Sequence, residues 1–276
     1  MASKVFVMLV FILIASFGSQ PLIYNQYRAR EEVYESAQPS LIINKVIAFS
    51  LHALQAHITA NDYEINNSSS SHISTPLMVA LTFDDGPCRN TKKILDILED
   101  HNVAATFCVI GKRIRRNEEV LMRTFESGHE IVGHSWNHER FTTLSREDIK
   151  NQIVRTNDEI YRVTGIVPIF HRVPYGAMSD TVVCVSEELG MAILSWSVDP
   201  RDWEYGATAE SIYEHIMENI FDGSIILFHD IHDVTVLAIE KIVPSLIAQG
   251  YQLMTVSELL SHSEYTIEAG KVFRYR

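Results

Sequence analysis

The stretch from residue 81 to residue 87 reads Leu81-Thr82-Phe83-Asp84-Asp85-Gly86-Pro87. Two adjacent carboxylates end an apolar run, and the Gly-Pro pair that follows is typical of a strand that stops. Neighbouring side chains in a strand point to opposite faces, but where the backbone turns both carboxylates can reach one crevice. One could then bind a metal while the other handles a proton. Because these residue types also form turns, a plain surface turn remains an alternative at this point.

Working outward, short apolar runs alternate with amphipathic stretches from about residue 76. The runs are typical of strands buried in a parallel sheet: Leu77–Phe83, Ala104–Ile110, Glu130–Val132, Val167–Phe170, Ala192–Trp196, Ser224–Phe228 and Gln252–Val256. The clearest helical patterns are Thr91–Asp100, Arg146–Val163, Ala209–Ile220 and Val236–Ala248. This alternation predicts an α/β domain. The number of units favours a barrel of about seven parallel strands over a small open sheet.

Composition excludes some classes of partner. The 276 residues are 46% hydrophobic and 21% charged, which is ordinary for a globular protein. The net charge of −12 argues against a nucleic-acid partner, because phosphate binding needs a basic surface. It also argues against docking on anionic lipid. The three cysteines match no CxxC pattern, so the fold is not built on disulfides.

The N-terminal part differs from the rest. Residues 1–18 have a lysine followed by an apolar run, which predicts a signal peptide or, if uncleaved, an N-terminal anchor. Residues 19–75 form an extension that ends in a Ser/Asn-rich linker. The α/β domain is expected to span 76–262 and to be followed by a C-terminal tail, 263–276. We therefore expect an exported protein that is secreted or associated with the cell surface or cell wall, with contact to the membrane only through an uncleaved anchor.

Polar clusters follow five of the predicted strands, where a barrel places its active site: Asp84-Asp85, Gly133-His134-Ser135-Trp136-Asn137-His138, His171-Arg172-Val173-Pro174-Tyr175-Gly176, Asp199-Pro200-Arg201-Asp202-Trp203 and His229-Asp230. His134 and His138 are spaced so that one helical turn would put both imidazoles on one side, close enough to share an ion. A carboxylate from the same rim would supply a third ligand. Asp230 and His232 are expected to be solvated loop residues rather than a second metal site.

The clusters resemble, in order, the five motifs of the polysaccharide deacetylase family, also known as the NodB-homology group or carbohydrate esterase family 4. The motifs are Thr82-Phe83-Asp84-Asp85, His134-Ser135-Trp136-Asn137-His138, Arg172-Val173-Pro174-Tyr175, Asp199-Pro200-Arg201-Asp202-Trp203 and Leu227-Phe228-His229. The resemblance covers roughly residues 76–260. It implies metal-dependent removal of N-acetyl groups from amino sugars on a distorted (β/α) barrel. His171 stands where the family often has an aromatic residue.

The resemblance also implies a role for each matching residue. Asp85, His134 and His138 would hold the metal, Asp84 would be the general base and His229 the general acid. Arg172 would orient Asp84, and Asp202 would set the charge state of His229. The remaining expected substrate contacts are the backbone N–H of Tyr175 and the side chains of Trp203 and Leu227, the last two walling the pocket for the acetyl methyl group. Without the motifs, these three residues would be interpreted as packing.

Amide hydrolysis needs these residue types in any case. A divalent ion lowers the pKa of bound water, and a nearby carboxylate such as Asp84 can take the proton. The amine leaves only when protonated, which suits a histidine kept cationic by Asp202. A ligand set of two His and one Asp most resembles a zinc site, although cobalt, nickel or manganese would also be accepted.

The expected substrate is an N-acetylated polysaccharide. The C-terminal motifs look most like those of bacterial peptidoglycan N-acetylglucosamine deacetylases, so peptidoglycan is ranked first. Chitin or chitooligosaccharide is the alternative, and a small-amide hydrolase or a non-catalytic wall-binding protein on the same barrel are further ones.

Overall fold

The computed structural model describes residues 76–276. The predictions for residues 1–18 and 19–75 therefore lie outside the described residues. Within 76–276, one sheet contains eight strands: β1 (Leu77–Asp84), β2 (Thr106–Val109), β3 (Glu130–Gly133), β4 (Phe170–Arg172), β5 (Ala192–Leu194), β6 (Ile225–His229), β7 (Tyr251–Leu253) and β8 (Val272–Phe273). β1 to β7 correspond to the seven predicted apolar runs.

Strand β1 has three strand partners, more than any other strand of the described sheet. Seven of its eight residues are buried, and it pairs in parallel with β2, β6 and β7. Its last residue, Asp84, lies opposite Cys108 of β2 and His229 of β6. The register therefore brings the ends of β1 and β6 side by side at the carboxyl edge of the sheet.

The sheet curls on itself, as the predicted barrel requires. Its order is β6-β1-β2-β3-β4-β5-β8, with β7 beside β1. Beyond β5 the chain returns to β6, where Val198 forms a parallel bridge with Ile226. The Leu227 N–H donates to Val198 O at 2.9 Å across this seam. The distorted barrel of about seven parallel strands is thus confirmed.

The two faces of β1 have different surroundings. Its residues 79, 81 and 83 lie in a hydrophobic cluster that also contains Leu95 of helix α4 (Arg89–Asp100) and Ile242 of helix α10 (Asp233–Ala248). Met78 and Ala80 belong to a second cluster on the concave face of the sheet. Since side chains alternate along a strand, Thr82 and Asp84 share that concave face. The interior is therefore apolar at the start of β1 and polar at its carboxyl end.

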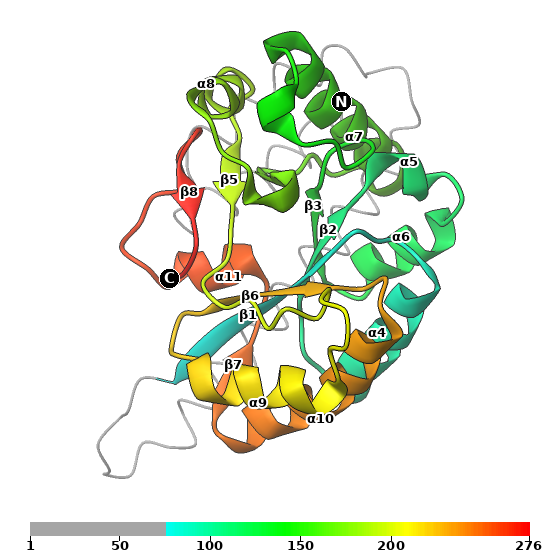
Figure 1. Cartoon of the computed structure of the whole chain (residues 1–276), viewed down its shortest axis with the longest axis vertical. Coiled ribbons are helices and arrows are strands. Elements are labelled where there is room, and N and C mark those ends of the chain that lie inside the picture. The colour runs from blue at the N-terminus through cyan, green and yellow to red at the C-terminus, as the bar shows by residue number, and fades with distance from the viewer. Residues whose placement is uncertain (1–75) are drawn as a thin grey trace, which may run out of the picture. The chain divides into compact units, whose positions relative to one another are not determined.

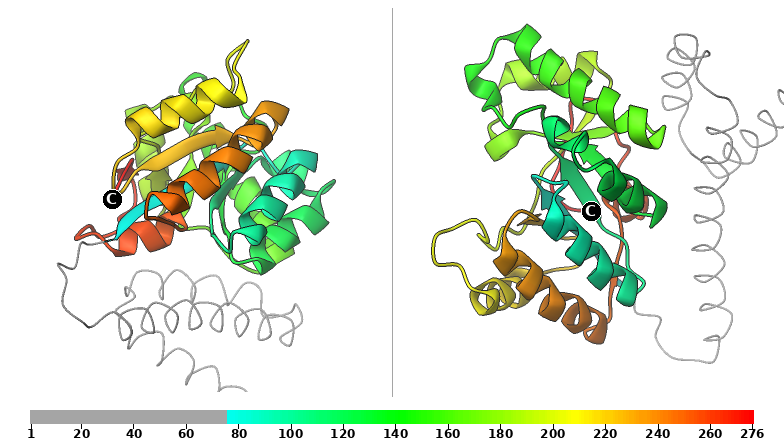
Figure 2. Two further views of the ribbon diagram at one scale, coloured as in Figure 1. Left: turned by 90° about the horizontal axis from the view of Figure 1, so that it is seen from below. Right: turned by 90° about the vertical axis from the view of Figure 1, so that its right-hand side faces the viewer.

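The helices lie mostly on the outer face of the sheet, but the buried residues of the last one, Val256–Ser261, belong to the cluster on the concave face. The helices are α4 (Arg89–Asp100), α5 (Gly111–Ile114), α6 (Glu118–Glu126), α7 (Arg146–Thr164), α8 (Asp180–Glu188), α9 (Ala209–Asn219), α10 (Asp233–Ala248), α11 (Val256–Ser261) and the 3-10 turns η1 (Phe141–Thr143) and η2 (Pro174–Gly176). Helix α10 packs between α4 and α9 (Figures 1 and 2). None of the helices in residues 76–276 is long and apolar enough to cross a membrane.

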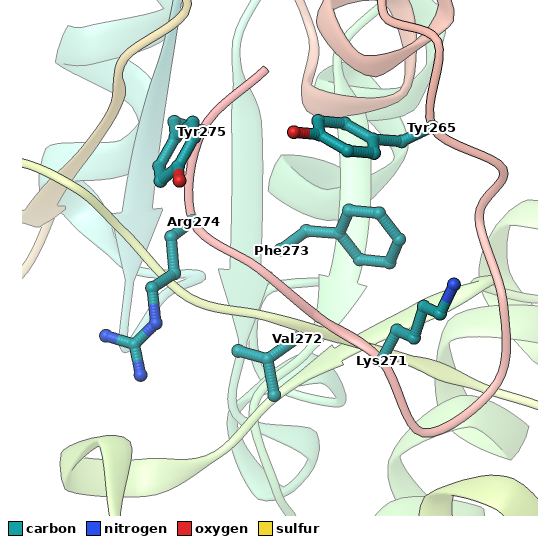
Figure 3. Close-up of a pocket in the computed structure, with 6 residues that line it drawn as sticks. All are labelled: Tyr265, Lys271, Val272, Phe273, Arg274 and Tyr275. Atoms are coloured by element: carbon teal, nitrogen blue, oxygen red, sulfur yellow. The ribbon is translucent and has the colours of Figure 1, made fainter.

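The segment 263–276, expected to be a tail, contributes β8, which pairs with β5. Its two residues have no apolar run around them, so the pattern used for the other strands could not reveal it. Beside β8 lies a cavity of about 340 Å³ (Figure 3). It is lined by Tyr265, Lys271, Val272, Phe273, Arg274 and Tyr275, none of which was predicted as a site residue.

Candidate active site

Asp85, His134 and His138 form the group of side chains in residues 76–276 that could hold a metal ion, with ligand atoms all within 4.8 Å of one another. Asp85 Oδ1 lies 3.5 Å from His138 Nε2 and 3.8 Å from His134 Nε2. The structure therefore brings the three predicted ligands together, although they come from the ends of two different strands.

The turn after β1 explains how two neighbouring carboxylates face one site. Asp85 has a φ of 79°, in the left-handed region that non-glycine residues seldom adopt. This reverses the alternation of the strand and lets Asp85 point to the side of Asp84. At Gly86, an added Cβ atom would collide with the buried carboxylate of Asp230, so a larger residue would fit only if Asp230 moved. The expected turn is real, and it serves to aim the carboxylates.

Asp230, expected to be a solvated loop residue, is instead fully buried. The hydroxyl of Thr91 donates to its Oδ2 at 2.5 Å. Burial raises the pKa of Asp230 to about 7, with the charges of Asp85 and Asp84 acting in the same direction and the Thr91 hydrogen bond opposing them. Asp230 thus packs behind the turn that carries Asp85 rather than forming a second metal site.

The two histidines do not lie on a helical turn, contrary to the prediction from their spacing. Residues 134–138 form a loop in which Ser135 and His138 have positive φ angles of 63° and 66°. The loop is held by the Gln152 side chain, which accepts from the N–H groups of Trp136 and Asn137 at 2.8 and 3.2 Å. The imidazole rings still meet, with centroids 5.0 Å apart, because the loop turns back on itself.

These residues fit a divalent ion. His134 Nδ1 lies 3.0 Å from the carbonyl oxygen of Arg172, so Nδ1 carries the proton and the Nε2 lone pair faces Asp85. Asp85 Oδ1 is buried and accepts no hydrogen bond from the described residues. Burial lowers the pKa of His138, and electrostatic repulsion between the two neighbouring imidazoles acts in the same direction, which favours the neutral ring that a metal requires.

Asp84 is paired with a buried arginine. Arg172 has no exposed surface, and its Nη1 donates to Asp84 Oδ1 and to Thr82 Oγ1, each at 2.7 Å. Arg172 Nη2 donates to Ser195 O at 3.0 Å. Burial alone would raise the pKa of Asp84, but the charge of Arg172, with that of His229 and the Arg172 hydrogen bond, outweighs it and lowers that pKa. Asp84 is therefore a carboxylate, 3.5 Å from His134 Nε2.

The second buried carboxylate, Asp202, holds His229. Asp202 Oδ1 lies 2.8 Å from His229 Nδ1, and its Oδ2 accepts from the His229 backbone N–H at 2.7 Å. Burial disfavours the charged imidazole, yet the hydrogen bond and charge of Asp202, together with the charges of Asp84 and Asp85, raise the pKa of His229 to about 9. At neutral pH His229 is an imidazolium beside Asp84.

The structure brings two of the three predicted substrate contacts, Tyr175 and Leu227, to this centre. Tyr175 has a φ of 61° and is 57% exposed, and its ring meets that of His138 at 4.6 Å between centroids. Leu227 is buried and lies opposite Thr82 in the sheet, so its side chain shares the concave face with Asp84. Trp203 is 48% exposed and its Nε1 donates to Asp199 Oδ1 at 3.4 Å. Among residues 76–276, Trp203 makes no hydrogen bond or ring contact with Asp85, His134 or His138.

Two contributors were not identified from the sequence. The Thr235 hydroxyl donates to Asp202 Oδ2 at 2.6 Å from the first turn of α10. Thr82 shares Arg172 Nη1 with Asp84. Thr82 could have been predicted to lie beside Asp84, because residues two apart on a strand share a face. Nothing in the sequence around Thr235 indicates that it contacts Asp202.

Comparison with known proteins agrees with this geometry. The polysaccharide deacetylase family model matches residues 58–194. A peptidoglycan-N-acetylglucosamine deacetylase, PgdA, of Listeria monocytogenes is 40% identical over 182 residues, which are 66% of this chain and 38% of that protein. This chain thus spans about two fifths of the length of the first curated relatives it matches. A peptidoglycan-N-acetylglucosamine deacetylase of Bacillus cereus is 37% identical over 67% of this chain and 89% of its own length.

A solved structure shows the same fold. It is a family 4 acetyl xylan esterase from Clostridium thermocellum in complex with a cobalt ion, with a TM-score of 0.68 and 32% identity. The match covers 72% of this chain and 98% of that chain.

Proposed function

The chain belongs to the polysaccharide deacetylase family, and we propose that it removes N-acetyl groups from the N-acetylglucosamine residues of peptidoglycan, releasing acetate. The observation that carries the proposal is the placement of two oppositely tuned groups beside the Asp85-His134-His138 group. Asp84 is held as a carboxylate and His229 as an imidazolium. A base and an acid separated in this way are what hydrolysis of an amide requires.

Asp85, His134 and His138 would hold one divalent ion, for which zinc is the best candidate and cobalt, nickel and manganese are alternatives. When bound, such an ion supplies Lewis-acid activation of the acetyl carbonyl and of water. The tautomer of His134 and the partnerless Oδ1 of Asp85 support this assignment.

The proton transfers fall to two residues. Asp84 takes a proton from the water whose oxygen bonds to the acetyl carbon, and Arg172 keeps its carboxylate ionised and aimed. His229 gives its proton to the sugar nitrogen as the carbon–nitrogen bond breaks, and Asp202 holds the ring in position. The backbone N–H of Tyr175 would donate to the oxyanion of the tetrahedral intermediate, and Trp203 and Leu227 would border the acetyl methyl group.

Peptidoglycan is proposed because both relatives above carry that substrate in their names. Acetate release from purified cell wall and from neutral N-acetylglucosamine oligomers should be compared for the wild type and His134→Ala. His262→Ala, which removes an exposed histidine from the end of α11, is the matched control. We expect release from cell wall that His134→Ala abolishes and His262→Ala retains. If acetate were released from the oligomers but not from cell wall, chitooligosaccharides would replace peptidoglycan as the proposed substrate.

We also propose that the protein is exported to the cell surface or wall, supported by the charged and apolar pattern of residues 1–18. Cell fractionation followed by N-terminal sequencing tests this. Recovery of the full-length chain in the cytoplasm alone would contradict it.

A further inference from the structure

The Lys and Arg side chains of this acidic protein differ in whether they form an ion pair with a carboxylate. Within residues 76–276, most Lys and Arg side chains lie within 4.0 Å of a carboxylate, as Arg123, Arg146 and Lys150 do. The ion pairs of the described residues include none for Lys112, Arg140 or Arg155, and all three side chains are exposed. These three cations contact the loop of the two metal-binding histidines or its neighbour Tyr175, and they are called the cationic rim below.

Arg140 stacks on Tyr175, one of the expected substrate contacts. Its guanidinium carbon is 4.4 Å from the centre of the Tyr175 ring, and that ring in turn meets His138. A guanidinium stacked on an aromatic face keeps its N–H groups directed outward, in the fork that matches a carboxylate. Arg140 therefore presents unneutralised donors beside the residue whose N–H is proposed to bind the oxyanion.

The other two cations hold the same loop from helices α5 and α7. Lys112 Nζ donates to the carbonyl oxygen of Asn137 at 3.3 Å. The guanidinium carbon of Arg155 lies 4.0 Å from the centre of the Trp136 ring. The two helices also pack against each other, which keeps the cations near the loop. A local positive potential next to a cleft attracts anionic substrates even when the net charge is negative.

We propose that the cationic rim, and Arg140 above all, binds a carboxylate of the substrate, so that the enzyme prefers acidic glycans over neutral ones. This inference rests on the proposed function and deepens it. In peptidoglycan the carboxylate has two possible sources, the acidic residues of the stem peptide and the lactyl group of muramic acid once the stem has been removed. Both offer the same planar acceptor to a guanidinium.

The test is the ratio of kcat/KM on an acidic substrate to kcat/KM on a neutral N-acetylglucosamine oligomer. Two acidic substrates are used: glycan strands with their stem peptides, and strands stripped by an amidase to expose the lactyl carboxylate. Arg140→Gln should lower the ratio about fivefold, the upper range for an exposed ion pair. Arg140→Lys keeps the charge but loses the fork, so it should lower the ratio less than Arg140→Gln does. Added salt should reduce the wild-type preference because it screens exposed charges.

Arg274→Gln is the matched control. Arg274 also lacks an ion pair among the described residues, but it lines the cavity beside β8, where Figure 3 shows it directed away from Phe273. Its substitution removes the same charge and should leave the ratio unchanged. A fall confined to one acidic substrate identifies the source of the carboxylate.

Two results would overturn the inference while leaving the proposed function intact. One is an unchanged ratio in Arg140→Gln. The other is an equal loss on all substrates in both Arg140→Gln and Arg140→Lys, which would mean that Arg140 acts by stacking on Tyr175. If the wild type released no acetate from any of the substrates, the proposed function itself would fail, and this inference with it.

Discussion

Two carboxylate–cation pairs flank the candidate metal group, and they resemble each other in geometry but not in effect. Asp84 and Arg172 meet at 2.7 Å, and Asp202 and His229 meet at 2.8 Å. All but His229 are almost completely buried. In the first pair the cation lowers the pKa of the carboxyl group, whereas in the second the carboxylate raises the pKa of the imidazole to about 9.

The difference follows from which partner titrates near neutral pH. Arginine stays charged in proteins, so its pairing with Asp84 can only favour the ionised carboxylate. Histidine titrates near neutrality, so its pairing with Asp202 changes the charge of the ring. One kind of contact thus leaves a carboxylate on one side of the site and an imidazolium on the other, the ionisation states that the proposed base and acid require.

The largest expected effect comes from removing the base while keeping its shape. Asp84→Asn should lower kcat by about a thousandfold, because general base catalysis contributes on the order of 100- to 10,000-fold. Metal binding, measured by metal analysis of the purified protein, should survive in Asp84→Asn and be lost in Asp85→Ala. Near-full activity in Asp84→Asn would show that the base is another residue.

Removing Arg172, the cation of the first pair, should lower the free energy of unfolding. Arg172→Leu leaves Asp84 buried without its cation, which typically costs about 3 kcal/mol of unfolding free energy. Urea denaturation of the wild type, Arg172→Leu and the double variant Arg172→Leu/Asp84→Leu would measure it. The double variant should recover part of the loss; no recovery would mean that the packing of Arg172, rather than its charge, is what stabilises the fold.

Breaking the second pair, Asp202 with His229, should shift the pH above which activity is lost. His229 must be protonated to act as an acid, so wild-type activity should fall as the pH rises through about 9. In Asp202→Asn the main cause of the raised pKa is gone, and the fall should occur at lower pH, toward the ordinary value of 6.5. The pH profile of kcat/KM measures this. If activity fell at the same alkaline pH in Asp202→Asn as in the wild type, His229 would not be the general acid.

Much of this arrangement could be predicted, because it depends on order along the chain. Apolar runs locate β1 to β7, and the rule that active sites lie at the carboxyl ends of parallel strands places Asp84, Arg172 and His229 on one edge. The i, i+4 spacing led us to expect that the rings of His134 and His138 meet, and they do, but a loop and not a helical turn brings them together.

The sequence by itself determined which residues could carry the chemistry, since strand patterns and motif order are local properties. Tertiary structure alone decided how they are tuned. Arg172 meets Asp84 across 88 positions of chain, and Thr235 meets Asp202 across 33. Burial of Asp230, the partnership of β8 with β5 and the stacking of Arg140 on Tyr175 likewise depend on segments that only the fold brings together. A pKa depends on burial and on neighbours in space, and neither is encoded in local spacing.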